Sequence, residues 1–170
     1  MILGMSIATF TLVHVVLSLV GIFAGLVVVF GMLGSKRLDG WAALFLATTV
    51  LTSVTGFFFP FDKILPSHIV GIISLVVLGI AILALYALHL AGSWRWIYVV
   101  SAVLALYLNV FVGVVQAFQK LPLLASLAPT QSEPPFLIAQ AAVLVIFVVL
   151  GVVAVRSFHP PADALASSAV

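Results

Sequence analysis

Five long apolar segments, separated by short polar stretches, dominate the hydrophobic pattern of this chain. A helix needs about 17–25 apolar residues to cross roughly 30 Å of hydrocarbon, and each segment has a length in or near that range. In lipid a spanning segment must satisfy its own backbone hydrogen bonds, as a helix does. The pattern therefore predicts an all-α integral membrane protein, a bundle of five transmembrane helices. The predicted spans are 7–33, 41–59, 67–91, 94–118 and 135–155.

The pattern predicts one domain followed by a short tail. We expect one transmembrane domain, residues 1–158, that contains all five spans. Residues 159–170 contain two prolines, mostly small side chains and no apolar periodicity, so we expect them to form a mobile cytoplasmic tail.

The composition supports lipid as the solvent. Of the 170 residues, 65% are hydrophobic and 6% are charged, whereas roughly 25% of the residues of a soluble domain are charged. The six Lys and Arg residues are scattered along the chain, and we therefore exclude nucleic acid as a partner. The absence of cysteine excludes thiolate nucleophiles and Cys-ligated metal centres.

The distribution of basic residues predicts the orientation, because Lys and Arg in short loops resist translocation. Lys36, Arg37, Arg95 and Arg156 fall on one side of the predicted spans, and Lys63 and Lys120 fall on the other. The first side should be cytoplasmic. We therefore expect the N-terminus outside, the C-terminus inside and the loops 59–66 and 119–134 facing outward, in a bacterial inner (plasma) membrane.

Small residues at helical spacing predict the faces through which the helices pack, since transmembrane helices associate where backbones approach closely. Gly21 and Gly25 form a GxxxG pair in the first span. In the fourth span a residue that is small or polar recurs at every fourth position, which places that helix at the centre of the bundle. These fourth-span positions are Ser101, Ala105, Asn109, Gly113 and Ala117.

Strongly polar side chains in the predicted spans lie mostly in the outer half of the membrane. An unpaired amide or imidazole in hydrocarbon costs several kcal/mol, so each requires a partner or water. We expect these side chains to line a polar pocket that opens toward the outer loops. The residues are His14, Thr55, His68, Asn109, Gln116 and Gln140.

Three functions are compatible with such a cluster. Hydrogen bonds between helices explain every polar residue without a ligand, which favours an accessory or assembly subunit that packs against another membrane protein or a second copy of itself. A passive channel or binding pocket for a small polar solute or ion is the first alternative. The second is a redox protein, in which His14 and His68 are the axial ligands of a b-type haem or one of them binds a quinone.

Intramembrane catalysis is disfavoured. Hydrolysis would need a nucleophile with a base, or a metal site, and the spans contain no paired carboxylates, no His-x-x-x-His and no Gly-x-Ser-x-Gly. We assign no catalytic residue, and lipid is the one partner that the composition itself requires.

Overall fold

The computed structural model describes residues 1–60 and 66–161, and within these ranges the chain is helical apart from turns and one isolated bridge between Ile2 and Met5. The elements, in chain order, are α1 (Ile7–Leu33), α2 (Asp39–Gly56), α3 (Pro66–Ile82), the π-helix η1 (Leu83–Ala87), α4 (Trp94–Lys120), α5 (Pro122–Leu127) and α6 (Pro134–Ser157). The proposed tail 159–170 lies largely outside the described residues.

Local chemistry explains where several helices begin. The Ser6 hydroxyl accepts a hydrogen bond from the Thr9 backbone N–H at 3.1 Å and caps α1. Helices α5 and α6 begin with proline, whose fixed φ suits the first helical turn and whose missing N–H would have no intrahelical partner there.

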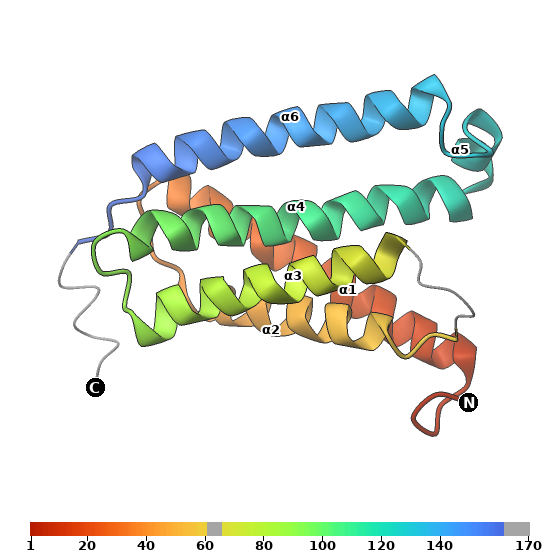
Figure 1. Cartoon of the computed structure of the whole chain (residues 1–170), viewed down its shortest axis with the longest axis horizontal. Helices are drawn as coiled ribbons and strands as arrows, with labels where there is room; N and C mark the ends of the chain where they lie inside the picture. Colours follow the sequence, from red (N-terminus) through yellow and green to blue (C-terminus); the bar gives the residue numbers. More distant parts are fainter. Residues whose placement is uncertain (61–65, 162–170) are drawn as a thin grey trace.

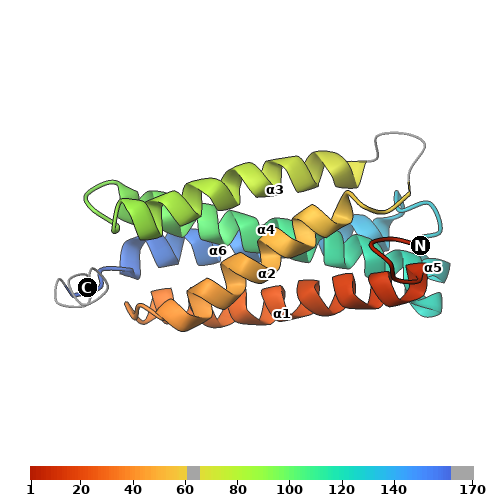
Figure 2. The same ribbon diagram turned by 90° about the horizontal axis from the view of Figure 1, so that it is seen from below.

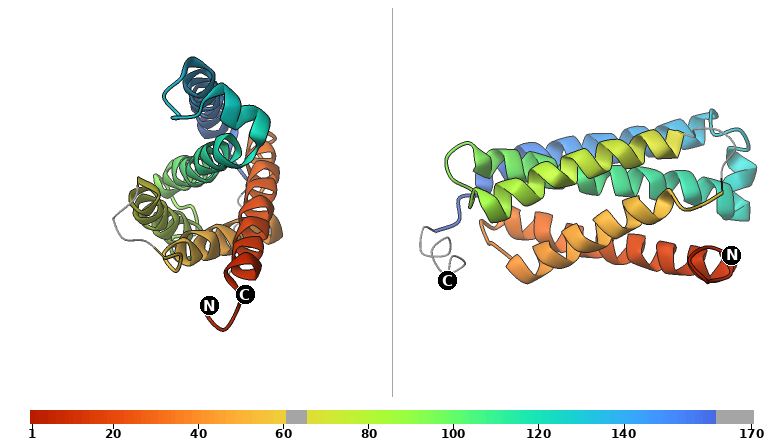
Figure 3. Two further views of the ribbon diagram at one scale, coloured as in Figure 1. Left: turned by 90° about the vertical axis from the view of Figure 1, so that its right-hand side faces the viewer. Right: turned by 60° about the horizontal axis from the view of Figure 1, so that its bottom comes forward.

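Helices α1 to α4 form a ring in which each packs against the next and α4 returns to α1. An end-on view shows this ring with α6 outside it, beside α4 (Figure 3). Helix α4 contacts every other helical element, whereas α6 contacts α4 and, less extensively, α1. The central position expected for the fourth span is therefore what the structure shows.

The two ends of the bundle differ in the termini and connections that lie there and in the apolar core. The N-terminus and α5 lie at one end, and the C-terminal segment lies at the other, together with the α1–α2 and α3–α4 connections (Figures 1 and 2). The main apolar core is concentrated toward the C-terminal end. Its fully buried large side chains include Met32, Phe45, Leu78, Leu85, Leu106 and Phe158.

Among the described residues, four helical segments are long and apolar enough to cross a membrane, which makes the chain a small multi-pass membrane protein. They are Ile7–Leu33, Ser67–Ala87, Trp94–Lys120 and Pro134–Ser157. Helix α2 is not among them. It begins with Asp39, and five of its 18 residues carry a hydroxyl group, which lowers its hydropathy.

Several predicted boundaries differ from those of the helices. The segment predicted as 41–59 is helical from Asp39 to Gly56, because the chain turns at Phe57 and Phe58. The segment predicted as 67–91 continues only through η1, since His89 and Leu90 adopt left-handed backbone conformations that end the helix. The last two spans extend to Lys120 and Ser157 at their C-terminal ends.

Candidate functional site

His14 of α1 is hydrogen-bonded to α2. Its Nδ1 lies 2.7 Å from Thr55 Oγ1, and the Thr55 hydroxyl in turn donates to the Leu51 carbonyl at 2.7 Å. A hydroxyl has one proton to donate, so Thr55 accepts from His14 Nδ1–H when its own proton goes to the Leu51 carbonyl. This assignment leaves the lone pair of the imidazole on Nε2. The Phe59 ring packs against the same imidazole, with ring centroids 5.2 Å apart.

A second polar contact joins α1 to α4 near the middle of both helices. The Ser18 hydroxyl donates to Asn109 Oδ1 at 2.9 Å, and Asn109 is buried. Gly21 lies one turn further along α1. A Cβ placed on Gly21 would lie 3.0 Å from Thr49 Oγ1, 3.2 Å from Thr48 Oγ1 and 3.3 Å from Asn109 Nδ2. The absence of a side chain at Gly21 thus lets three polar side chains converge on α1.

The hydroxyl groups of α2 are mostly used within their own helix. Thr48 and Thr52 donate to carbonyls one turn earlier, at 2.7 and 2.9 Å. Ser53 does the same and also lies 3.2 Å from the Ser74 hydroxyl of α3. Thr49 is the exception, because its buried Oγ1 has no hydrogen-bond partner within the described part of the chain.

His68 lies at the start of α3 and is buried. Its ring packs against Phe57, with centroids 5.7 Å apart, and it takes part in further interactions. His14 packs against a different phenylalanine, Phe59, and is hydrogen-bonded to α2. The two histidines expected as a haem pair thus lie at the same end of the bundle, each against its own aromatic side chain.

The two glutamines of the expected pocket lie in different environments. Gln140 of α6 is buried against α4, where its Nε2 donates to the Phe111 carbonyl at 3.2 Å. Its buried Oε1 has no partner among the described residues. Gln116 is exposed on the surface of α4, about one turn before the helix ends. The structure therefore does not place Gln116 with the buried polar side chains.

The small residues predicted to mediate packing lie mostly at helix contacts. A Cβ on Gly25 would come within 2.6 Å of Leu106 and 2.9 Å of Phe45, so these side chains occupy the space that Gly25 leaves open. Ser101 and Ala105 are buried. A Cβ on Gly113 would lie 3.7 Å from Ile22, an ordinary contact, and Ala117 near the end of the same stripe is half-buried.

The connection between α5 and α6 is ordered by Glu133. Its carboxylate accepts hydrogen bonds from the Thr130 hydroxyl at 2.8 Å and from the Thr130 and Ser132 backbone N–H groups, both at 3.1 Å. Desolvation raises the pKa of Glu133, but these hydrogen bonds outweigh it and hold that pKa below its ordinary value of 4.5.

A cavity of about 450 Å³ lies beside this loop, lined by Phe118, Gln119, Ala125, Pro129, Thr130 and Gln131. The other loop that was expected to face outward, 59–66, contains Asp62 and Lys63, which lie outside the described residues.

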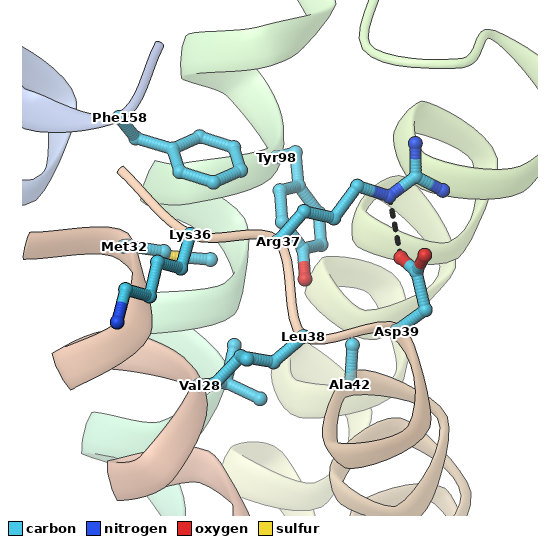
Figure 4. Close-up of a pocket in the computed structure, with 9 residues that line it drawn as sticks. All are labelled: Val28, Met32, Lys36, Arg37, Leu38, Asp39, Ala42, Tyr98 and Phe158. Carbon is cyan, nitrogen blue, oxygen red and sulfur yellow. Dashed lines mark hydrogen bonds and ion pairs between the residues drawn. The ribbon is translucent and has the colours of Figure 1, made fainter. Parts of the chain in front are cut away.

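A polar group that the sequence did not reveal lies at the C-terminal end of the bundle (Figure 4). The Arg37 side chain is 7% exposed and forms an ion pair with Asp39 through Nε. It lines a small pocket with Lys36, Tyr98 and Phe158, among others. From the sequence, Arg37 served only to predict the orientation of the chain in the membrane. Its burial could not be predicted, because it depends on contacts with segments far along the chain.

Arg95 of α4 forms hydrogen bonds with the end of α6 in the same region. Its Nη1 donates to the carbonyls of Phe158 at 2.6 Å and Val155 at 3.2 Å. The His159 backbone N–H donates to the Ser35 hydroxyl at 2.9 Å. Helix α6 is thus tied to both α4 and the α1–α2 loop at this end.

No protein-family model matches the chain, and no curated protein or solved structure matches it. Within the described residues there is also no group of three His, Asp or Glu side chains placed to hold a metal ion.

Proposed function

We propose that this chain is an accessory or assembly subunit of a bacterial plasma membrane, and that it acts by packing α6 against another membrane component. All five long helices cross the bilayer, with the N-terminus outside and the C-terminus in the cytoplasm. Helix α2 crosses despite its hydroxyl groups, because it lies along the other helices within the ring and uses most of those hydroxyls internally.

The exposure of α6 is the observation that carries this proposal. Only 6% of the residues in its apolar stretch are buried, compared with 44% in α4. A helix that is apolar on all faces is usually covered by protein or lipid on every side. Both ends of α6 are nevertheless fixed by specific hydrogen bonds, at Gln140 and at Arg95. The helix is therefore presented in a defined orientation with nearly all of its outer face available.

The polar side chains support the same proposal. His14, Ser18 and Gln140 form hydrogen bonds to neighbouring helices. Such contacts hold a bundle together and require no ligand.

Site-specific photo-crosslinking in native membranes tests the proposal. A photoreactive residue at Val145 or Val149, both exposed on α6, should yield one discrete protein adduct. Matched positions Leu12 and Leu19, exposed on α1, should give lipid adducts only. Co-expression of two differently tagged copies distinguishes a foreign partner from a second copy of this chain. Equal, diffuse labelling from both helices would contradict the accessory role.

A ligand-binding role is the second candidate, and the hydrogen bond between His14 and Thr55 favours it. When Thr55 accepts from Nδ1–H, the Nε2 lone pair is available to a b-type haem iron or to the hydroxyl of a quinol. His68 would be the second axial ligand. A Soret band that is lost in both His14→Ala and His68→Ala would support haem, whereas a colourless protein expressed with ample haem would exclude it.

A further inference from the structure

Helix α5 presents apolar side chains that the described part of the chain does not cover. Leu123 is 73% exposed, and Leu127, one turn later, is 50% exposed. None of the six residues of α5 is buried. Residues 121–132 also contain no charged side chain. A connection that lies in water is normally polar, so the composition of this one indicates different surroundings.

The two faces of α5 have different neighbours. Leu123 and Leu127 are four residues apart and therefore share a face. Ala125 lies about 200° around the helix from Leu123 and lines the cavity beside Gln131. Gln131 Nε2 donates to the Val115 carbonyl of α4 at 3.0 Å, which fixes the following loop to the bundle. The cavity side of α5 thus faces the rest of the protein, and the two leucines face away from it.

The position of α5 matches the level of the lipid headgroups. The helix follows directly after α4, whose last residue, Lys120, is exposed. It lies near the N-terminal ends of α1 and α6 (Figure 1) and crosswise to both (Figure 3). Leu137 and Ile138, in the first turns of α6, begin the exposed apolar surface of that helix at the same end. A helix that lies in the plane of the interface places its apolar side among the acyl chains.

The N-terminal turn presents a further leucine at this end of the bundle (Figure 1). Ile2 and Met5 exchange two backbone hydrogen bonds of 2.9 Å, and Leu3 and Gly4 form the turn between them with φ of 50° and 78°. Turns with positive φ at both central residues favour Asn, Asp or Gly at the first of them. Leu3 is 67% exposed. Turn geometry does not account for a leucine here, whereas contact with an acyl chain does.

We propose that α5 and the N-terminal turn are interfacial anchors, which insert Leu123, Leu127 and Leu3 into one leaflet of the bilayer. The partner is the lipid surface itself. One anchor holds the connection between α4 and α6, the other holds the start of α1, and together they fix the depth of this end of the bundle. The inference rests on the membrane placement of the helices, but it requires neither the accessory role nor a particular orientation.

Nitroxide labelling of the protein in liposomes tests this placement. The chain has no cysteine, so Leu123→Cys, Leu127→Cys and Leu3→Cys each provide a single labelling site. Oxygen concentrates in the acyl region, whereas a neutral nickel chelate stays in water. The ratio of oxygen to nickel collision rates should be several-fold higher at these positions than at Ser132→Cys, the matched exposed position in the polar loop. It should be lower than at Val145→Cys in the middle of α6, because an interfacial helix lies above the hydrocarbon centre.

Two outcomes would overturn the proposal. Ratios at the three leucine positions that equal the ratio at Ser132→Cys would place both segments in water. Low collision rates with oxygen and nickel alike would show that protein, such as a second copy of this chain, covers the leucines. Photo-crosslinking from α6 reports on the accessory role separately, so either proposal can fail while the other stands.

Discussion

The two halves of the bundle are held together by different interactions. In the half near the N-terminus, which we call the polar half, hydrogen bonds join the helices through the pairs His14–Thr55, Ser18–Asn109 and Ser53–Ser74. In the half near the C-terminus, the apolar half, closely packed side chains such as Phe45, Leu85 and Leu106 take that role among α1 to α4. Close packing gains from every contact atom, whereas a hydrogen bond between helices adds a modest, directional contribution.

Phe45→Ala should have the largest effect of the four changes considered, because Phe45 is fully buried at the contact of α2 with α1 and α4. The cavity should lower the free energy of unfolding by about 3–5 kcal/mol. Reversible unfolding in mixed micelles measures this loss. Phe30→Ala removes an equally large but exposed ring and serves as the control, with little expected change. Equal losses for the two variants would contradict a packed apolar half.

Gly25→Ala tests the same half by adding volume instead of removing it. The new Cβ would come within 2.6 Å of Leu106 and 2.9 Å of Phe45, so both side chains must shift. We expect a loss of about 1–3 kcal/mol. Gly113→Ala adds the same methyl group at 3.7 Å from Ile22 and should be tolerated. Similar thermal unfolding curves for the two variants would argue against a close approach of helices at Gly25.

The Ser18–Asn109 pair tests the polar half through a double-mutant cycle. Asn109→Ala should cost about 1–2 kcal/mol, and the coupling energy with Ser18→Ala should be about 0.5–1.5 kcal/mol. Coupling between Asn109→Ala and Phe158→Ala should be close to zero, since Phe158 packs against Tyr98, about three helical turns from Asn109 along α4. Strong coupling between these two variants would show that the halves do not act independently.

The smallest effect concerns the loop that leads into α6. Because the folded-state pKa of Glu133 is lowered, its carboxylate stabilises this loop above the unfolded-state pKa, and the contribution is lost as the pH falls through the folded value. Amide resonances of Thr130 and Ser132 should therefore titrate below about pH 4.5. In Glu133→Gln the same resonances should not change over that range. A transition that persists in this variant would assign it to another group.

The helices themselves could largely be predicted from the sequence. Residues 7–33 were expected as a span and form α1 with the same limits, because Ser6 caps the start and the apolar run is uninterrupted. The central position of α4 followed from its stripe of small residues. The end of the third span after η1 could not be predicted, since His89 and Leu90 carry no turn-forming side chain yet adopt left-handed conformations.

Less of the candidate site than of the helices could be predicted from the sequence. Gln116 was expected in the polar pocket, but it lies about 100° around the helix from its neighbour Ala117 and is exposed. The burial of Arg37 could not be inferred, because the pocket walls Tyr98 and Phe158 come from segments far along the chain. The position of a residue in the sequence predicts its depth in the membrane. Which side chains it contacts depends on how the helices pack, and the sequence alone does not give this.

The external position of α6 also bears on the order of assembly during synthesis. The ring closes through contacts among α1, α2, α3 and α4, all of which precede α6 in the chain. Residues 1–120 can therefore complete their own contacts first, and α6 is added last along the side of α4. With a helix of this kind, the exposed face appears only after the ring is complete.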